Sequence, residues 1–176
     1  MKTLICSILI MTLISPYIIF DFTESSQLQN WRITNDVVMG GKSNSKFILD
    51  ENGNGQFTGN VSLENNGGFC LLSYYFDPIQ VKSFTKISIR LKGDSKNYQF
   101  RLKEKSNQYY SYVYSFKTNG DWEEIEIPLK EMKPMFRGRK VDKSNFSEID
   151  FEEIGFLIGN KKNESFKLLI DKIELK

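Results

Sequence analysis

Apolar residues recur at every second position in short segments of the chain, and turn residues separate the segments. In segment 85–91, for example, Ile87, Ile89 and Leu91 share one face. A period of two is that of a half-buried β-strand, and clusters of Gly, Asn and Asp between such runs mark turns. The pattern predicts strands at 18–22, 45–49, 56–63, 69–76, 85–91, 98–103, 110–116, 122–127, 154–158 and 166–175.

This succession of short strands predicts an all-β fold, an antiparallel β-sandwich or jelly roll. The sequence shows no sustained 3.6-residue period, which a long amphipathic helix would produce. A chain of 176 residues is long enough for one domain, which is expected at 18–176. Asp77-Pro78 is expected to end the strand before it. The stretch 132–147 is the only long segment predicted to be irregular, and it contains Phe136-Arg137-Gly138-Arg139-Lys140.

The N-terminal segment 1–16 has the pattern of an export signal. Lys2 precedes an apolar run from Leu4 to Ile14, which is shorter than a comfortable membrane span. We therefore expect an exported or envelope-associated protein, with no integral membrane span beyond this leader. The alternative interpretation is an apolar lead-in to the first core strand of a cytoplasmic protein.

Composition excludes several classes of chemistry. The chain has no histidine, so Ser-His-Asp and Cys-His catalysis and His-ligated zinc are not available. Two cysteines, Cys6 and Cys70, cannot form a zinc site. A net charge of +2 with interspersed signs is no nucleic-acid footprint. We expect no metal, no cofactor and no nucleic-acid partner.

The segment 31–43 contains the most unusual turn of the chain. Asn35 and Asp36 head the apolar tripeptide 37–39, and Gly40-Gly41 follows it. Asx side chains bond backbone N–H groups in turns, and glycine permits close backbone approach. A second Gly-Gly stretch at 65–69 echoes the first. We expect the Asp36 carboxylate to be shielded from water and therefore to need donors.

Several segments together resemble one family. These are 35–43 (Asn-Asp-Val-Val-Met-Gly-Gly-Lys-Ser), 57–63 with 66–69, Gly93-Asp94 with Tyr98, Trp122 with Pro128, Phe136-Arg137-Gly138-Arg139, and Ile154-Gly155-Phe156. They occur in the order found in the NADH:ubiquinone oxidoreductase complex I intermediate-associated protein 30 family, and the chain is identified as a bacterial member. The resemblance implies a galactose-binding-domain-like jelly roll and an assembly role of chaperone type.

Asp36, Asp94, Arg137 and Arg139 are the charged residues inside these segments. With Asn35, Gly40 and Gly41 they form a candidate polar cluster, either a binding site at the rim of the sandwich or a structural ion-pair network. We favour the structural interpretation, because ion-pair networks also gather charges in this way. It predicts that Arg137 or Arg139 holds Asp36, directly or through the turn's backbone, and so anchors the stretch 132–147.

Aromatic and acidic residues elsewhere favour structure over catalysis. Tyr110, Tyr112 and Tyr114 are expected on the core face, although they could also form a platform for sugar rings. Cys70 lies in an apolar strand and indicates packing rather than a nucleophile. Paired glutamates such as Glu123 with Glu124 and Glu152 with Glu153 fit charged alternation on a solvated strand. The chain is therefore predicted not to be an enzyme.

Two hypotheses on function remain, from different classes. The resemblance favours a non-catalytic, chaperone-like binding or assembly module with a protein partner. The implied fold alone favours a carbohydrate-binding module of the cell envelope. An exposed aromatic strip on a concave face would favour sugar, whereas a broad apolar patch beside the basic segment 136–140 would favour protein.

Overall fold

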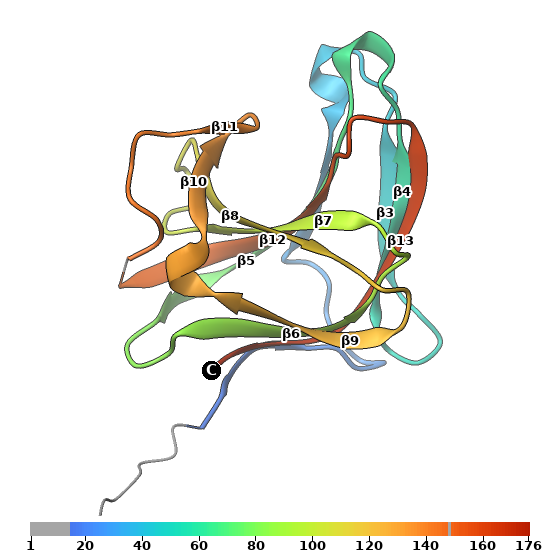
Figure 1. Cartoon of the computed structure of the whole chain (residues 1–176). Coiled ribbons are helices and arrows are strands. Elements are labelled where there is room, and N and C mark those ends of the chain that lie inside the picture. Colours follow the sequence, from blue (N-terminus) through green and yellow to red (C-terminus); the bar gives the residue numbers. More distant parts are fainter. Residues whose placement is uncertain (1–14, 148) are drawn as a thin grey trace, which may run out of the picture.

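The computed structural model describes residues 15–147 and 149–176, except for the side chains of Val38 and Met39. Over these ranges the chain folds into two antiparallel β-sheets packed face to face (Figure 1). This confirms the predicted all-β jelly-roll sandwich. The expected leader 1–16 lies almost wholly outside the described residues, so export stays a prediction.

One sheet has six strands among the described residues, in the order β3-β4-β13-β6-β9, with β1 paired to β13. Its strands are β1 (Tyr17–Asp21), β3 (Asn44–Leu49), β4 (Gly55–Val61), β6 (Lys86–Lys92), β9 (Trp122–Pro128) and β13 (Glu164–Leu175).

The other sheet has seven strands in the described ranges, in the order β11-β10-β8-β7-β12-β5-β2. They are β2 (Trp31–Asn35), β5 (Cys70–Gln80), β7 (Asn97–Lys103), β8 (Ser111–Lys117), β10 (Lys133–Phe136), β11 (Arg139–Lys140) and β12 (Asp150–Ile158). Three short 3-10 turns complete the elements: η1 (Asp36–Met39), η2 (Glu64–Asn66) and η3 (Leu129–Glu131).

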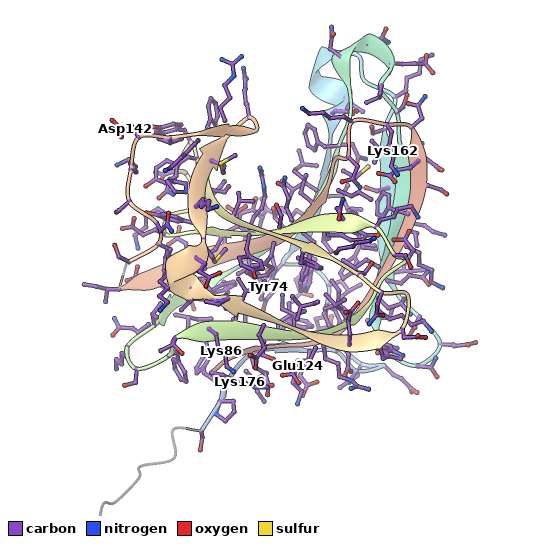
Figure 2. All side chains as sticks on the ribbon, in the orientation of Figure 1. Tyr74, Lys86, Glu124, Asp142, Lys162 and Lys176 are labelled. Carbon is purple, nitrogen blue, oxygen red and sulfur yellow. The ribbon has the colours of Figure 1, made fainter. Side chains whose placement is uncertain are left out.

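The core between the sheets contains the residues that alternation placed on one face of each strand. Ile87, Ile89 and Leu91 of β6 are fully buried, as are Phe100 and Leu102 of β7. Tyr110 and Tyr112 are buried, and Tyr114 packs against the core, which confirms the core interpretation for these tyrosines. Tyr74 also packs against the core and stacks on Trp31 with ring centroids 4.6 Å apart (Figure 2).

Two predictions about strand limits are wrong. Strand β5 continues through Asp77-Pro78 to Gln80. Proline is tolerated there because the pairing with β12 shifts register between Phe151 and Glu153, and such a bulge leaves positions without ladder hydrogen bonds. The stretch 132–147 is not wholly irregular either. It forms the hairpin β10–β11 around Arg137-Gly138, whose φ values of 47° and 76° are both left-handed, as two-residue hairpin turns prefer.

Candidate functional site

The two Gly-Gly turns meet at the Asp36 carboxylate. Asp36 is 7% exposed and accepts hydrogen bonds from the Ser43 hydroxyl at 2.6 Å, the Ser43 amide at 3.2 Å and the Phe69 amide at 3.2 Å. The Gly68 amide also donates to it. Four donors around one buried carboxylate satisfy it without a cation. Asp36 therefore ties the turn after β2 to the turn before β5.

Glycine is needed on both sides of this carboxylate. A Cβ on Gly41 would lie 2.4 Å from Asp36 Oδ1, and a Cβ on Gly67 would lie 2.6 Å from Asp36 Oδ2. Neither distance is possible between non-bonded atoms, so a side chain at either position would push the carboxylate out of place. This close approach is the physical reason for a glycine in each turn.

The hydrogen bonds also set the charge state of Asp36. Burial raises the pKa of this carboxyl, but the bonds from the Ser43 hydroxyl and from the Gly68, Phe69 and Ser43 amides outweigh that effect. The pKa of Asp36 is thus held below its ordinary value, because each donor stabilises the ionised form. The Asp36 carboxylate is therefore an anion held by backbone N–H groups and by Ser43. This arrangement serves the structure of the turns.

The other predicted residues divide between this network and a separate one. Asn35 Oδ1 accepts a hydrogen bond from the Ser45 hydroxyl at 2.7 Å, and the Gly40 carbonyl accepts one from the side-chain amide of Asn65 at 2.8 Å. Asp94 instead accepts bonds from the Tyr98 hydroxyl at 2.8 Å and the Lys167 amide at 3.0 Å, beside the six-stranded sheet. The structure does not bring Asp94 into contact with Asp36.

The predicted link between Asp36 and the arginines is wrong. Arg137 and Arg139 are exposed in the β10–β11 hairpin, and neither is among the partners of Asp36 in the described residues. The hairpin stands at one edge of the seven-stranded sheet, and the η1 and η2 turns rise at the opposite edge (Figure 1). Backbone amides of the second Gly-Gly turn take the place that a guanidinium was expected to fill.

A groove of about 450 Å³ lies between these two walls, on the face of the seven-stranded sheet turned away from the core. Its floor is made of the alternate residues that the core does not use. Polar side chains from four neighbouring strands line it: Ser73, Gln99, Arg101, Lys103, Ser111 and Glu153. The sequence shows Gln99, Arg101 and Lys103 alternating with core residues, but only the strand order puts them beside Ser73 and Glu153.

One position on the floor of the groove has no side chain. Gly155 of β12 pairs with Arg101 of β7 on one side and with Ser73 of β5 on the other. Residues opposite each other on neighbouring strands project to the same face. The side chains of Arg101 and Ser73 therefore lie on the groove face on either side of Gly155, where an added Cβ would come within 2.8 Å of the Leu72 carbonyl oxygen.

Arg101 lines the groove and has one unsatisfied donor below its surface. Its Nε is buried without a hydrogen-bond partner. Burial lowers the pKa of Arg101, and the nearby Glu153 carboxylate opposes that effect. Glu153, 5% exposed, is paired instead with Lys103, whose Nζ lies 3.1 Å from Glu153 Oε2, although the two are not aligned for a hydrogen bond. Arg101 keeps its positive charge, because a guanidinium is not deprotonated in proteins.

Aromatic side chains form one rim of the groove. Tyr109 is 61% exposed and Phe136 is 40% exposed, and their rings meet edge to face with centroids 5.3 Å apart. The Arg137 guanidinium lies 5.3 Å from the Phe136 ring centroid. A second hollow continues from here over the hairpin, lined also by Arg139, Lys140 and Val141. An elongated ligand could thus run from the sheet floor across an aromatic rim.

The described ranges 15–147 and 149–176 also bear on metal binding and membrane insertion. No group of three or more His, Cys, Asp or Glu residues there could hold a metal ion. No helix in those ranges has the length and apolar character that a membrane span requires.

Two known proteins are similar to this chain in sequence. The mouse mitochondrial complex I intermediate-associated protein 30 is 24% identical over 182 residues, covering 88% of this chain and 54% of that protein. An uncharacterised protein of Schizosaccharomyces pombe is 28% identical over 78% of this chain and 70% of its own length. The chain therefore spans about half the length of the mouse relative.

Solved structures with the same fold include a family 11 carbohydrate-binding module of Clostridium thermocellum. That structure, in complex with a β-1,3-1,4-mixed-linked tetrasaccharide, superposes with a TM-score of 0.69, covers 93% of this chain and 96% of its own, and is 20% identical. The model of the complex I intermediate-associated protein 30 family matches residues 20–170. The chain belongs to the complex I intermediate-associated protein 30 family.

Proposed function

We propose that this protein is a non-catalytic binding module that holds a stretch of a carbohydrate chain in the groove of the seven-stranded sheet. Tyr109 and Phe136 carry the proposal, because they form an exposed aromatic rim beside a polar floor. Aromatic faces cover the apolar faces of sugar rings, and the polar floor offers hydrogen bonds to the hydroxyl groups. The groove is also open at the hairpin end, which suits a chain rather than a small molecule.

The sequence left two functions open, sugar binding and protein assembly, and each would need a different kind of exposed surface. A sugar ligand required an exposed aromatic strip on a concave face, and the groove has an aromatic rim of this kind. The fold shared with the Clostridium thermocellum module, whose structure contains a tetrasaccharide, is compatible with this role. Sugar binding is therefore preferred over a protein partner for the groove itself.

Catalysis is not part of the proposal. The chain has no histidine, and Cys70 is buried in β5. Glu153 is the one carboxylate that lines the groove in the described part of the chain, and Lys103 neutralises it. Glycoside hydrolysis usually needs two carboxyl groups across the scissile bond.

Binding can be tested by affinity electrophoresis of the purified protein in gels that contain single polysaccharides, neutral and acidic. We expect retardation by at least one of them. Tyr109→Ala and Phe136→Ala should each weaken it about tenfold, as loss of an aromatic contact of ~1.5 kcal/mol implies. Tyr17→Ala, which removes an exposed tyrosine of β1 outside the groove, serves as the control. No retardation by any polysaccharide would end the proposal.

A second candidate function is protein assembly of the chaperone type. The name of the mouse relative supports it, as does the exposure of two apolar residues at the Gly-Gly turns, Val37 at 59% and Leu63 at 42%. A tagged protein and its Val37→Ser/Leu63→Ser variant can be compared in a crosslinking pull-down from the native envelope fraction. Partners lost with the apolar pair would favour assembly, and an identical set would count against this surface.

Export to the cell envelope belongs to the same proposal, with the cytoplasm as the alternative. It rests on Lys2 and the apolar run from Leu4 to Ile14. Fractionation of cells that express the full chain tests it. A wholly cytoplasmic protein with Met1 intact would contradict export, whereas the binding groove would be unaffected.

A further inference from the structure

We infer that the ligand of the groove is an acidic saccharide, one whose sugar residues carry a carboxylate or a sulfate ester, and that Arg101 receives this group. The inference rests on the proposed carbohydrate-binding function and adds the chemical class of the ligand.

The charges around the groove are unequal. Three cationic residues line it, Arg101, Lys103 and Arg137, against the single carboxylate of Glu153. Glu153 pairs with Lys103 and its charge also acts on Arg101, so two cationic residues of the groove share one carboxylate. Arg137 adds a third cation. Arg139 and Lys140 line the hollow that continues over the hairpin. Cationic residues therefore outnumber carboxylates along the path of an extended ligand, although the whole chain carries a net charge of only +2.

Arg101 is placed to bind an anion rather than to support the fold. Its Nε is buried without a hydrogen-bond partner, and Glu153 is occupied by Lys103. Gly155 and Ser73 line the groove beside Arg101, with Gly155 paired between the two. The planar guanidinium fork matches two oxygens of a carboxylate or a sulfate, so one anionic group in the groove would balance the charge of Arg101.

A neutral sugar would leave this site poorly matched. Hydroxyl groups can accept a hydrogen bond from Arg101 but cannot balance a partly buried charge, and a buried unbalanced charge is costly. A nucleic acid would also bring anionic groups, but the exposed aromatic rings of the groove are confined to the rim at Tyr109 and Phe136. Sequence-tolerant nucleic-acid binding needs successive stacking platforms along the strand. The groove therefore favours an acidic glycan.

The test compares four polymers by isothermal titration calorimetry with the full chain. They are polygalacturonate, which carries carboxylates, κ-carrageenan, which carries sulfate esters, a neutral mixed-linkage β-glucan, and a single-stranded oligonucleotide. We expect one acidic glycan to bind at least tenfold more tightly than the neutral glucan. The two acidic polymers distinguish carboxylate from sulfate. Raising the salt concentration should weaken acidic binding, because screening acts on charge pairs.

Variants locate the anion. Arg101→Gln should lower affinity for the acidic glycan at least tenfold and remove most of the preference over the neutral glucan, whereas Arg101→Lys, which keeps the charge but not the fork, should fall between. Arg90→Gln is the matched control, because Arg90 lies on the six-stranded sheet and pairs with Asp171 at 2.9 Å. If Arg101→Gln fails to fold by circular dichroism, the preference and salt dependence of the wild-type protein decide the matter.

The outcomes separate the inference from the function on which it rests. Neutral glucan bound as tightly as the acidic glycans, without salt dependence, would overturn the acidic ligand and leave carbohydrate binding in place. Failure of every polysaccharide to bind would overturn both. An oligonucleotide bound more tightly than either acidic glycan would replace the saccharide with a nucleic acid and also overturn the inference.

Discussion

The hydroxyl of Ser43 donates a 2.6 Å hydrogen bond to the Asp36 carboxylate, and both side chains are buried. The same hydroxyl accepts a bond from the Ser62 amide at 3.0 Å. Asp36 and Ser43 thus connect the turn after β2 with the end of β4, and the amides of Gly68 and Phe69 extend the connection to β5. One carboxylate joins segments that belong to both sheets.

Replacing Asp36 by alanine should destabilise the protein clearly. The change leaves the Ser43, Gly68 and Phe69 amides without their acceptor, and unsatisfied buried donors cost about 1–3 kcal/mol each before relaxation. We expect a net loss of roughly 2–4 kcal/mol, or about 10 °C in melting temperature for a domain of this size. Differential scanning fluorimetry measures it. Asp142→Ala, at an exposed carboxylate on the outer side of the hairpin (Figure 2), should stay within about 0.5 kcal/mol.

The contribution of Asp36 should disappear in acid. Its pKa is lower in the folded protein than its ordinary value of 3.8, so the unfolded chain binds the proton more tightly. The stabilisation is therefore complete above that value and is lost as pH falls through the lower pKa of the folded state. Urea unfolding of wild type and Asp36→Asn between pH 3 and 6 should show a stability gap that narrows below about pH 4. A gap that widens there would contradict the lowered pKa.

The arginines of the hairpin should contribute little to stability. Arg137 and Arg139 are exposed and do not contact Asp36. The double variant Arg137→Ala/Arg139→Ala should unfold within about 1 kcal/mol of wild type, as exposed charges usually do. The same variant should weaken acidic-glycan binding if the groove continues over the hairpin. A large fall in melting temperature would instead restore the arginines as anchors of the fold.

The thiol of Cys70 should resist modification while the protein is folded. Burial raises its pKa to about 11, a hydrogen bond with Ser45 lowers it slightly, and the Asp36 charge raises it. Thiolate is the reactive form, so little of it exists at pH 8. In a Cys6→Ser variant, a thiol-specific chromogenic reagent should react fully only in denaturant. Rapid reaction of the native protein would show that the strand opens or that Cys70 is accessible.

Much of the fold could be read from the chain because its signals are local. Alternation placed Ile87, Ile89 and Leu91 in the core, and the same rule placed Tyr112 there, since a strand shows its two faces to different surroundings. The turn residues separated the strands for an equally local reason. Pro78 shows the limit, because it lies where β5 itself bulges against β12, a distant segment, and no ladder hydrogen bond is required from the backbone of position 78.

The shielding of Asp36 was also predictable, but its partners were not. An acidic residue at the head of an apolar turn must find donors, which is a statement about one position. Which donors it finds depends on which distant segment packs beside it. In the folded chain these donors include the backbone amides of Gly68 and Phe69, which are 32 and 33 residues away in sequence. Hydrogen bonds between distant backbone groups leave no pattern in side-chain identity, so the sequence favoured the arginines.

The sequence by itself determined the strands, their inward faces, the two glycine turns and the need of Asp36 for donors, because each follows from a short-range periodicity or from the chemistry of one residue. Only the tertiary structure decided the groove. Arg101, Glu153 and Ser73 belong to three strands that the sheet order makes neighbours, with Gly155 paired between Arg101 and Ser73. A binding surface assembled across a sheet is a relation between distant segments, and the physical reason for it is the register that packing imposes.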